Sequence, residues 1–364
     1  MNEFVFAQPV RLYFGAGRLD TLSDILKELG VSKAVMVCDP FLRAKAEELR
    51  KKCPVIMDIF SDVEPNPQLR GAEAAALMAR ELQAEAIIGM GGGSTMDTAK
   101  FAAGTALSEL PIDVCYEQAR FAEKRLLVIA IPSTAGTGSE VTQVSVMSRG
   151  EEKKTINNPV FMPAAAVVDP CLMLTVPPRQ TMMTGLDALS HALEGFWSVN
   201  HQPICDLYAE EAIRLVLQNL ERSFRDGQDL EARSNMAYAA LLAGLAFGQP
   251  KTAGCHACSY PLSQDYHLPH GEACAFTLDS FVQINTSPRM EEMLRRAGLP
   301  GGSAELVSRI RALKALAGLR TKLGDLGQVD VEKLAEDCAV HPLMRNNPVK
   351  MSREALKSMF EALS

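Results

Sequence analysis

Four side chains in this sequence have the chemistry to bind one transition metal together. Asp187 and His191 lie in TGLDALSHALEGF, whose apolar residues follow a helical period, so their spacing of four places both side chains on one face, one turn apart. His256 and His270 lie in GCHACSYPLSQDYHLPHGEA. One carboxylate and three imidazoles suit Fe, Zn, Co or Ni and disfavour Ca or Mg. A lone histidine is more often an ordinary core or surface residue, but these three candidates are half of the chain's six histidines and all lie in these two segments.

Two glycine-rich segments in the first half are typical of nucleotide binding. IIGMGGGSTMDTAK places glycines between an apolar run and a helical pattern, where the backbone can approach a pyrophosphate and a helix N-terminus offers free N–H groups. IPSTAGTGSEVT places a Gly- and Thr-rich loop after another apolar run. The G-x-G-x-x-G fingerprint is absent, and a glycine cluster by itself also occurs in ordinary turns. Two such loops at adjacent strand ends predict a nucleotide crevice.

Asp39 ends the apolar run KAVMVCD and precedes Pro40. A carboxylate there can accept hydrogen bonds from a ribose diol and repels a 2′-phosphate, which predicts NAD rather than NADP. The alternative is an aspartate that begins a turn before the proline. The glycine-rich loops favour the cofactor interpretation.

The elements that must position these residues change character along the chain. The first half alternates apolar runs with helical patterns, which predicts strands at 33–39, 54–60, 84–90 and 125–134 in a doubly wound parallel sheet. Beyond VPPRQ, long amphipathic stretches with few strand signals predict an all-helical second domain. The expected fold class is therefore α/β plus all-α. A Rossmann-like dinucleotide-binding domain spans 1–178, and a helical metal-binding domain spans 179–364.

Composition narrows the classes of partner. The 364 residues carry a formal net charge of −7, which disfavours a nucleic-acid surface. No apolar run approaches the ~18–20 residues of a membrane helix, and the N-terminus lacks the pattern of a signal peptide. Nine cysteines, an odd number, indicate reduced thiols and a cytoplasmic location. The C-x-x-C of Cys255 and Cys258 has neither a thioredoxin-like setting nor a second pair, so we interpret it as a coincidence within a helical segment.

The chain resembles the iron-containing (group III) alcohol dehydrogenase family in an ordered set of motifs that covers nearly its whole length: FGAG (14–17), GGGSTMDTAK, PSTAGTGSEVT, VVDP (167–170), TGLDALSHALEGF and the H…PHG segment. The resemblance implies an NAD-dependent enzyme that interconverts a small alcohol and its aldehyde with one divalent metal. It implies Fe(II), while the ligand chemistry also accepts zinc. The family's metal ligands fall on Asp187, His191, His256 and His270. Its NAD-contacting positions fall on Asp39, Asn66, Gly92, Gly93, Ser94, Ser133, Thr134, Thr137 and Lys154.

One position departs from the family pattern. Most members have H-x-x-x-H before PHG, whereas the second position here is Tyr260. This variant, with YHLPHGEA, resembles the 4-hydroxybutyrate dehydrogenases of the family, so we expect 4-hydroxybutyrate and succinate semialdehyde as the substrate pair. Sulfoacetaldehyde, phosphonoacetaldehyde, lactaldehyde and unsubstituted aldehydes are the alternatives. Tyr260 and His267 are candidates for proton relay, although a solvent-facing loop position explains His267 equally well.

Other functions and partners follow from the remaining features. A nucleotide-binding protein without chemistry is one alternative, but unused buried His and Asp side chains would be costly. A metal-free reductase, like the maleylacetate reductase branch, is another. FVFAQPVRLYFG (4–15) is expected to form edge strands, and the resemblance implies that it pairs across the two-fold axis of a homodimer. Candidate partners for a substrate carboxylate, with a solvated surface turn as the alternative, are Arg345, Asn346, Asn347 and Lys350.

Overall fold

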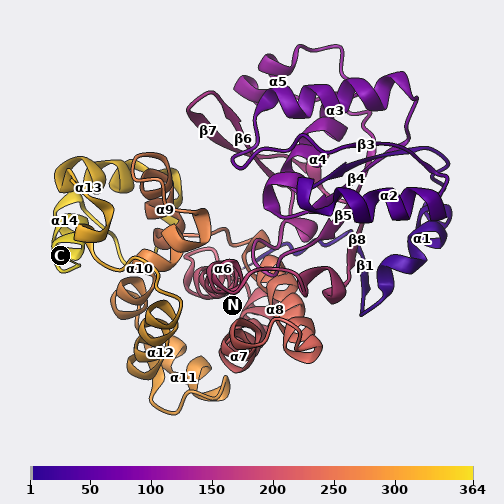
Figure 1. Ribbon diagram of the computed structural model, residues 1–364. Coiled ribbons are helices and arrows are strands. Elements are labelled where there is room, and N and C mark those ends of the chain that lie inside the picture. Colours follow the sequence, from indigo (N-terminus) through magenta and orange to yellow (C-terminus); the bar gives the residue numbers. More distant parts are fainter. Residues whose placement is uncertain (1–2, 364) are drawn as a thin grey trace. The chain divides into compact units, whose positions relative to one another are not determined.

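The computed structural model describes residues 3–363 and divides into two compact units (Figure 1). One unit comprises Ala7–Thr134 and Ser139–Leu174. The other comprises residues 3–6, Ala135–Gly138 and residues 175–363. The division therefore differs from the expected one at 178, because the chain changes unit after Leu174 and two short segments of the first half cluster with the helices.

The first unit is built on a six-stranded parallel sheet with the order β1-β8-β5-β4-β2-β3 (Figure 1). Its strands are β1 (Arg11–Phe14), β2 (Ala34–Cys38), β3 (Ile56–Phe60), β4 (Ala86–Gly91), β5 (Leu127–Pro132) and β8 (Ala165–Val168). The expected strands at 33–39, 54–60, 84–90 and 125–134 are confirmed as β2, β3, β4 and β5. Strand β8 carries the VVDP motif, for which the sequence indicated no strand.

Helices cover both faces of this sheet, which confirms the doubly wound class. They are α1 (Leu22–Glu28), α2 (Arg43–Lys52), α3 (Leu69–Glu81), α4 (Gly93–Thr105) and α5 (Ile112–Gln118). Met36 of β2 packs in a core with residues of α1 and α2, whereas the next residue, Val37, packs with α3 and α4. Because successive side chains enter opposite cores, β2 is apolar at every position rather than at alternate ones.

This unit also contains an antiparallel hairpin that was not predicted from the sequence. Strands β6 (Val144–Arg149) and β7 (Glu152–Asn157) pair on either side of a turn at Gly150, whose φ of 62° favours glycine. The alternation in VSVMSR and the following glycine were the local signals for it. The hairpin matters for the site because β7 contains Lys154.

The N-terminal segment corrects a further expectation. Within FVFAQPVRLYFG, only Arg11–Phe14 forms a strand in the structure. The residues up to Phe6 belong to the helical unit, where the Val5 carbonyl accepts a hydrogen bond from Gln202 Nε2 at 3.4 Å and the Phe6 ring lies 6.1 Å from that of Tyr208. Pro9 lacks the N–H group that a continuous ladder would need.

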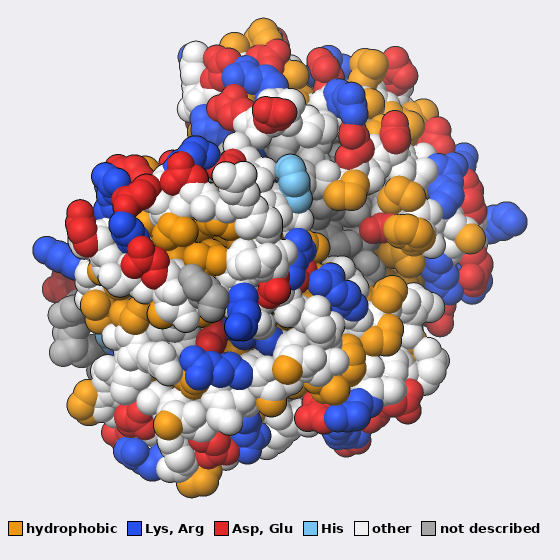
Figure 2. All heavy atoms as spheres, turned by 60° about the vertical axis from the view of Figure 1, so that its left-hand side comes forward, with side chains coloured by type: hydrophobic (Ala, Val, Ile, Leu, Met, Phe, Trp, Pro, Cys, Tyr) orange, Lys and Arg blue, Asp and Glu red, His pale blue; other side chains and the backbone are white. Residues whose placement is uncertain are grey.

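The second unit is helical throughout its described residues, as expected. Its helices are α6 (Pro178–Trp197), α7 (Pro203–Arg225), α8 (Leu230–Gly248), α9 (Gly254–Gln264), α10 (His270–Ile284), α11 (Pro288–Arg296), α12 (Gly302–Leu316), α13 (Val331–Val340) and α14 (Arg353–Glu361). Within residues 3–363, no helix combines the length and apolar character needed to cross a bilayer. Figure 2 shows acidic and basic side chains interspersed with apolar ones over the face in view, without a continuous basic stripe.

Candidate functional site

The four expected metal ligands meet around one carboxylate oxygen. Helix α6 carries Asp187 and His191, which are 2% and 5% exposed, and His191 Nδ1 lies 3.8 Å from Asp187 Oδ1. His256 near the start of α9 and His270 at the start of α10 place their Nε2 atoms 3.5 Å and 3.8 Å from the same oxygen. Residues separated by about 80 positions in the chain are thus brought together by the packing of α6, α9 and α10.

The unsatisfied polar atoms of this cluster fit a bound cation. Asp187 Oδ1, His191 Nδ1 and His256 Nε2 are buried without a hydrogen-bond partner. Each such atom costs about 1–3 kcal/mol unless another partner compensates it. Donor atoms that share a tetrahedral ion at about 2.0–2.3 Å lie roughly 3.3–3.8 Å apart, and the observed separations from Asp187 Oδ1 are 3.5–3.8 Å. The residues present therefore suit a divalent transition metal.

The sequence interpretation missed Glu194, which orients His256. This glutamate is fully buried on α6, and its Oε2 is in hydrogen-bond contact with His256 Nδ1. Its Oε1 accepts backbone N–H groups at the start of α9, from Ala253 at 2.9 Å and Cys255 at 2.8 Å. With Nδ1–H held by Glu194, the Nε2 lone pair of His256 is directed at the metal position. The spacing of Asp187, His191 and Glu194 on one helical face was the available signal.

Gly271 lets α10 approach α6 closely enough for His270 to join the cluster. A Cβ atom at this position would lie 2.4 Å from the Met183 carbonyl oxygen and 3.5 Å from Asp187 Cβ. Any larger residue would push the start of α10 away from α6. The glycine of the PHG motif is therefore explained by packing next to a ligand.

The protonation states of two ligands suit metal binding. Burial lowers the pKa of His191 to about 4, so its imidazole is neutral near pH 7. Burial would raise the pKa of Asp187, but the charges of His191, His270 and His256 outweigh it and hold that pKa below its ordinary value. Metal ligands must be a neutral imidazole and an ionised carboxylate, which is the state favoured at both positions.

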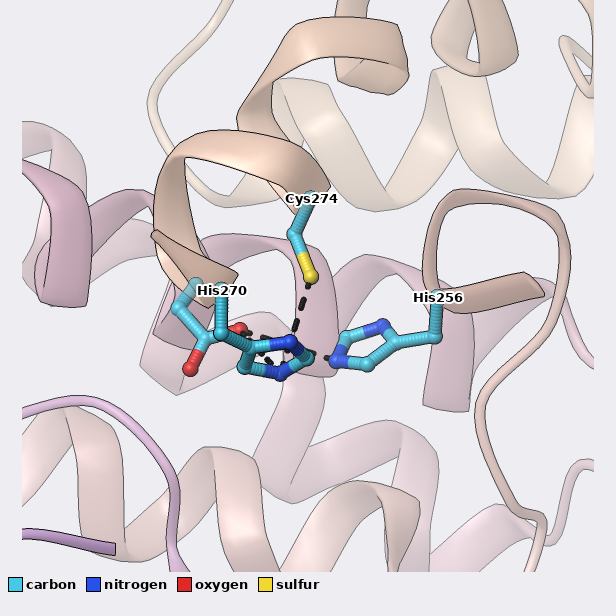
Figure 3. Close-up of side chains that lie close together, drawn as sticks. His256, His270 and Cys274 are labelled. Atoms are coloured by element: carbon cyan, nitrogen blue, oxygen red, sulfur yellow. Dashed lines mark hydrogen bonds and ion pairs between the residues drawn. The ribbon is translucent and has the colours of Figure 1, made fainter. Parts of the chain in front are cut away.

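One group of neighbouring donor atoms includes a residue that was not expected. Asp187, His256, His270 and Cys274 each offer an atom, and these atoms all lie within 4.8 Å of one another. The side chains of His256, His270 and Cys274 converge, with Cys274 Sγ 3.8 Å from His270 Nε2 (Figure 3). His191 is not a member of this group, but its Nδ1 lies as close to Asp187 Oδ1, at 3.8 Å, as His270 Nε2 does.

The expected cofactor residues gather at the carboxyl edge of the parallel sheet. The Asp39 N–H donates to the Met90 carbonyl at 3.0 Å, and the Ser133 N–H donates to the Gly91 carbonyl at 2.9 Å, so the ends of β2, β4 and β5 adjoin. Asp39 Oδ1 also accepts the Phe41 N–H at 2.9 Å. Asp39 therefore begins a turn, as the alternative interpretation held, while its second oxygen leaves an acceptor for a ribose hydroxyl.

Helix α4 opens directly onto this edge. Gly92 precedes its first residue, Gly93, and no side chain caps the helix, so the first N–H groups, including that of Ser94, are available to an anion. A Cβ on Gly92 would lie 3.7 Å from Thr134 Oγ1, which places the two glycine-rich loops side by side. This arrangement suits the phosphate cradle that their sequences indicate, and the binding role of the two loops stays a prediction.

The second half of GGGSTMDTAK makes hydrogen bonds to the segment after β5, so its polar side chains have a structural role rather than a cofactor contact. Lys100 is fully buried on α4, and its Nζ donates to the Ser139 carbonyl at 2.6 Å and the Thr142 carbonyl at 3.0 Å. Asp97 accepts the Ser139 hydroxyl at 3.1 Å and the Val146 N–H at 3.0 Å. Burial lowers the pKa of Lys100 to about 8. The hydrogen bonds of Lys100 and Asp97 together hold the segment that follows β5 in place.

The remaining expected cofactor residues are dispersed. Asn66 is left-handed, with φ 55°, and its Oδ1 accepts Lys153 Nζ at 3.0 Å. Lys154 on β7 donates to the Glu117 carbonyl at 2.7 Å. Thr137 lies in the segment 135–138 that clusters with the helical unit. Their cofactor roles stay predictions.

Both halves of the chain match known protein families. The model of the "Iron-containing alcohol dehydrogenase" family matches residues 9–170, and that of the "Fe-containing alcohol dehydrogenase family, C-terminal" matches residues 181–364. The long-chain-alcohol dehydrogenase 1 of Geobacillus thermodenitrificans is 33% identical over 97% of this chain and 95% of its own. The chain belongs to the iron-containing alcohol dehydrogenase family. It is an alcohol dehydrogenase whose cofactors are NAD and a divalent metal.

Two further relatives of this alcohol dehydrogenase illustrate the range of the family. The 1,3-propanediol dehydrogenase of Klebsiella pneumoniae is 31% identical, over 98% of both chains. The crystal structure of a sulfoacetaldehyde reductase from Bifidobacterium kashiwanohense in complex with NAD+ superposes with a TM-score of 0.96 at 38% identity, covering 100% of this chain and 99% of that one. The expected fold class is thereby confirmed.

Of the two proton-relay candidates in this alcohol dehydrogenase, Tyr260 is the better placed. It follows His256 by one turn of α9, and its ring stacks on His341 at 4.5 Å between centroids. His341 Nδ1 accepts the Leu343 N–H at 3.3 Å, and burial, followed by the charge of His256, lowers the pKa of His341. His341 was missed, because nothing in its local sequence links it to α9. His267, by contrast, is exposed in the loop between α9 and α10, where its backbone is left-handed with φ 55°.

The segment suggested for substrate recognition is largely structural in this alcohol dehydrogenase. Asn347 is buried and exchanges hydrogen bonds of 2.9 Å and 3.0 Å with Asn285. Asn346 Nδ2 donates to the Thr252 carbonyl at 2.8 Å, which anchors the approach to α9. Arg345 and Lys350 are exposed, in agreement with the alternative of a solvated turn.

Proposed function

We propose that this alcohol dehydrogenase interconverts a short primary alcohol that carries an anionic group with its aldehyde, using NAD and Fe(II). Sulfoacetaldehyde and succinate semialdehyde, the latter paired with 4-hydroxybutyrate, are the members of this class to be tested first. The observation that carries the proposal is the likeness, over the whole chain, to a sulfoacetaldehyde reductase at 38% identity and a TM-score of 0.96.

Two partly exposed arginines near His270 support an anionic substrate. Glu272, two residues after His270, is fully buried and accepts hydrogen bonds at 3.0 Å from Arg179 Nη2 and from Arg320 Nη2. The side chains of Arg179 and Arg320 are 46% and 31% exposed. Burial would raise the pKa of Glu272, but Arg320 and Arg179 keep it below its ordinary value, and the charge of Asp325 also acts on Arg320. Guanidinium N–H groups that Glu272 does not occupy are available to a sulfonate or carboxylate.

The roles of the protein's own groups follow from the geometry. When bound, the metal supplies Lewis-acid polarisation of the substrate oxygen, and NAD supplies the hydride acceptor. Asp187, His191, His256 and His270 would hold the metal, and Glu194 keeps His256 in the ligating tautomer. Gly92, Gly93 and Ser94 would bind the cofactor phosphates, and Asp39 the ribose. Tyr260 is proposed to pass the hydroxyl proton toward solvent. The free thiols at all nine cysteines support a reducing, cytoplasmic location.

The substrate class is tested by comparing kcat/KM for sulfoacetaldehyde, succinate semialdehyde and butyraldehyde with NADH. A site that pairs an anionic group should favour the charged aldehydes by at least about tenfold, which corresponds to ~1.4 kcal/mol of transition-state binding. Equal or better turnover of butyraldehyde would contradict the proposal and leave a general aldehyde reductase.

The contribution of the arginine pair is separable with a matched control. Arg320→Gln should remove most of the preference for the charged aldehydes while changing butyraldehyde turnover little. Arg311→Gln is the control, because Arg311 also pairs with a buried carboxylate on α10, Asp279, at 2.7 Å, but lies farther along the helix. An unchanged preference in Arg320→Gln would place the anion elsewhere.

The preference for NAD is tested at Asp39. We expect the wild type to use NADH at least tenfold better than NADPH, and Asp39→Gly to reduce that ratio by removing the ribose acceptor and the repulsive charge. Asp39→Asn separates the two effects, since it keeps a hydrogen-bonding side chain and loses only the charge. Better use of NADPH than of NADH by the wild type would overturn the interpretation of Asp39.

We also propose a homodimer that uses the open edge of the sheet. Strand β1 pairs only with β8 and lies at the end of the strand order, and Leu12 on it is 41% exposed. An unpaired edge strand readily pairs with another chain. Light scattering should give the dimer mass for the wild type and a smaller mass for Leu12→Glu. A wild-type mass equal to one chain at all concentrations would contradict the proposal.

A further inference from the structure

Cys274 occupies a position next to the metal ligands that none of the expected roles explains. It lies one turn after His270 on α10, is fully buried, and places Sγ 3.8 Å from His270 Nε2. Its sulfur also lies within 4.8 Å of the donor atoms of Asp187 and His256. Figure 3 shows the sulfur pointing toward the two imidazoles rather than away into the helix packing.

Two polar atoms near this sulfur lack a partner that a cation would supply. Asp187 Oδ1 and His256 Nε2 are buried and have no hydrogen-bond partner. Asp187 is 2% exposed and His256 4%, and neither can turn to solvent. A cation placed among these atoms would contact the thiol as well, because donor atoms at Zn–S and Zn–N distances of about 2.3 Å and 2.0–2.1 Å lie roughly 3.5 Å apart.

Cys274 differs from the other cysteines in its surroundings. All nine thiols are free, and eight of them are buried. Buried free cysteines usually act as small apolar side chains, and Cys255 and Cys258 on α9 fit that description. Within residues 3–363, Cys274 is the cysteine that shares a cluster with carboxylate and imidazole donors.

We propose that the Cys274 thiolate is a ligand of the divalent metal in the enzyme without substrate, together with Asp187, His256 and His270. The inference rests on the metal site of the proposed function but not on the substrate class. His191 Nδ1, which is also buried and lies 3.8 Å from Asp187 Oδ1, is then a fifth donor to the same ion. A soft sulfur donor shifts the metal preference of an otherwise hard-to-borderline site toward Zn.

Cobalt substitution tests this assignment without an activity assay. Co(II) bound to a thiolate shows an intense near-ultraviolet charge-transfer band, whereas carboxylate and imidazole ligands do not produce it. We expect the band in the Co(II)-loaded wild type and in Cys258→Ser, a matched variant of a buried cysteine outside the cluster. It should be absent from Cys274→Ser and Cys274→Ala at equal cobalt content. A band that persists in Cys274→Ser, or that the wild type lacks, overturns the proposal.

X-ray absorption of the Zn-loaded wild type tests whether Cys274 is a ligand even if a Cys274 variant fails to bind metal. One sulfur scatterer at about 2.3 Å is expected beside nitrogen and oxygen neighbours. A shell of nitrogen and oxygen alone overturns the assignment of Cys274. Since neither measurement involves a substrate, failure here leaves the proposed activity intact, and failure of the substrate tests leaves this ligand assignment intact.

Discussion

Replacing His256 by alanine is expected to strip the metal from the protein and to lower kcat/KM by at least ~10³-fold. His256 Nε2 is one of the atoms closest to Asp187 Oδ1, at 3.5 Å, and it is buried without another partner. Its loss removes a preoriented ligand and leaves Glu194 buried without its imidazole. Polarisation of the substrate oxygen by a metal contributes several kcal/mol to catalysis, and ~4 kcal/mol corresponds to about 10³-fold in rate.

The measurements are metal content by elemental analysis and steady-state kinetics, with His267→Ala as the matched control. His267 is an exposed histidine in the same α9–α10 region and outside the ligand cluster, so its variant should retain full metal. Full occupancy in His256→Ala would refute the ligand assignment. A wild type that is active without bound metal would instead support the metal-free reductase considered from the sequence.

The second large effect is expected at Glu194, which contacts the metal through His256. Glu194→Gln should weaken metal binding by about 10–100-fold, the usual loss when the partner of a ligating histidine is changed. The carboxylate both receives His256 Nδ1–H and accepts the N–H groups of Ala253 and Cys255 at the start of α9. An amide has the shape of the carboxylate but lacks its charge, so it favours the ligating tautomer less and interacts less with the helix dipole.

Metal affinity in this variant is measured by competition with a chelator, followed by kinetics at saturating metal. Activity should recover substantially once the site is filled, because Glu194 is not itself a ligand. Glu140→Gln provides a comparison, since Glu140 is a buried glutamate of the sheet unit, 3% exposed, and should leave metal affinity unchanged. Equal affinity in wild type and Glu194→Gln would show that the hydrogen bond to His256 Nδ1 does not orient the ligand.

The sequence by itself was sufficient for features that depend on neighbours in the chain. A spacing of four on a helix brings Asp187 and His191 together in any fold that keeps α6, because the helical period is a local property. The central strands were recognisable because a strand buried on both faces is continuously apolar, as in β2. The order of elements was enough to indicate a parallel sheet followed by a helical domain.

Features that depend on contacts between distant segments were decided by the tertiary structure. Glu194 acquires its role only when α9 begins against α6, and Gly271 only because α10 must pass the Met183 carbonyl closely. His341 stacks on Tyr260 through the packing of the segment after α13 near α9, a contact across about 80 residues of chain. No local pattern contains such distances.

The same reason explains why one expected strand is shorter than its sequence indicates and why one donor near the expected ligands was missed. The segment before Arg11 has the composition of a strand, but Val5 and Phe6 contact Gln202 and Tyr208 of the helical unit instead of extending β1. The ligand motif indicated three histidines and an aspartate, whereas the packing of α10 also directs Cys274 Sγ at their donor atoms. Periodicity determines which face of a helix a residue occupies, but the partner that this face meets is set by packing, where many weak contacts far apart in sequence act together.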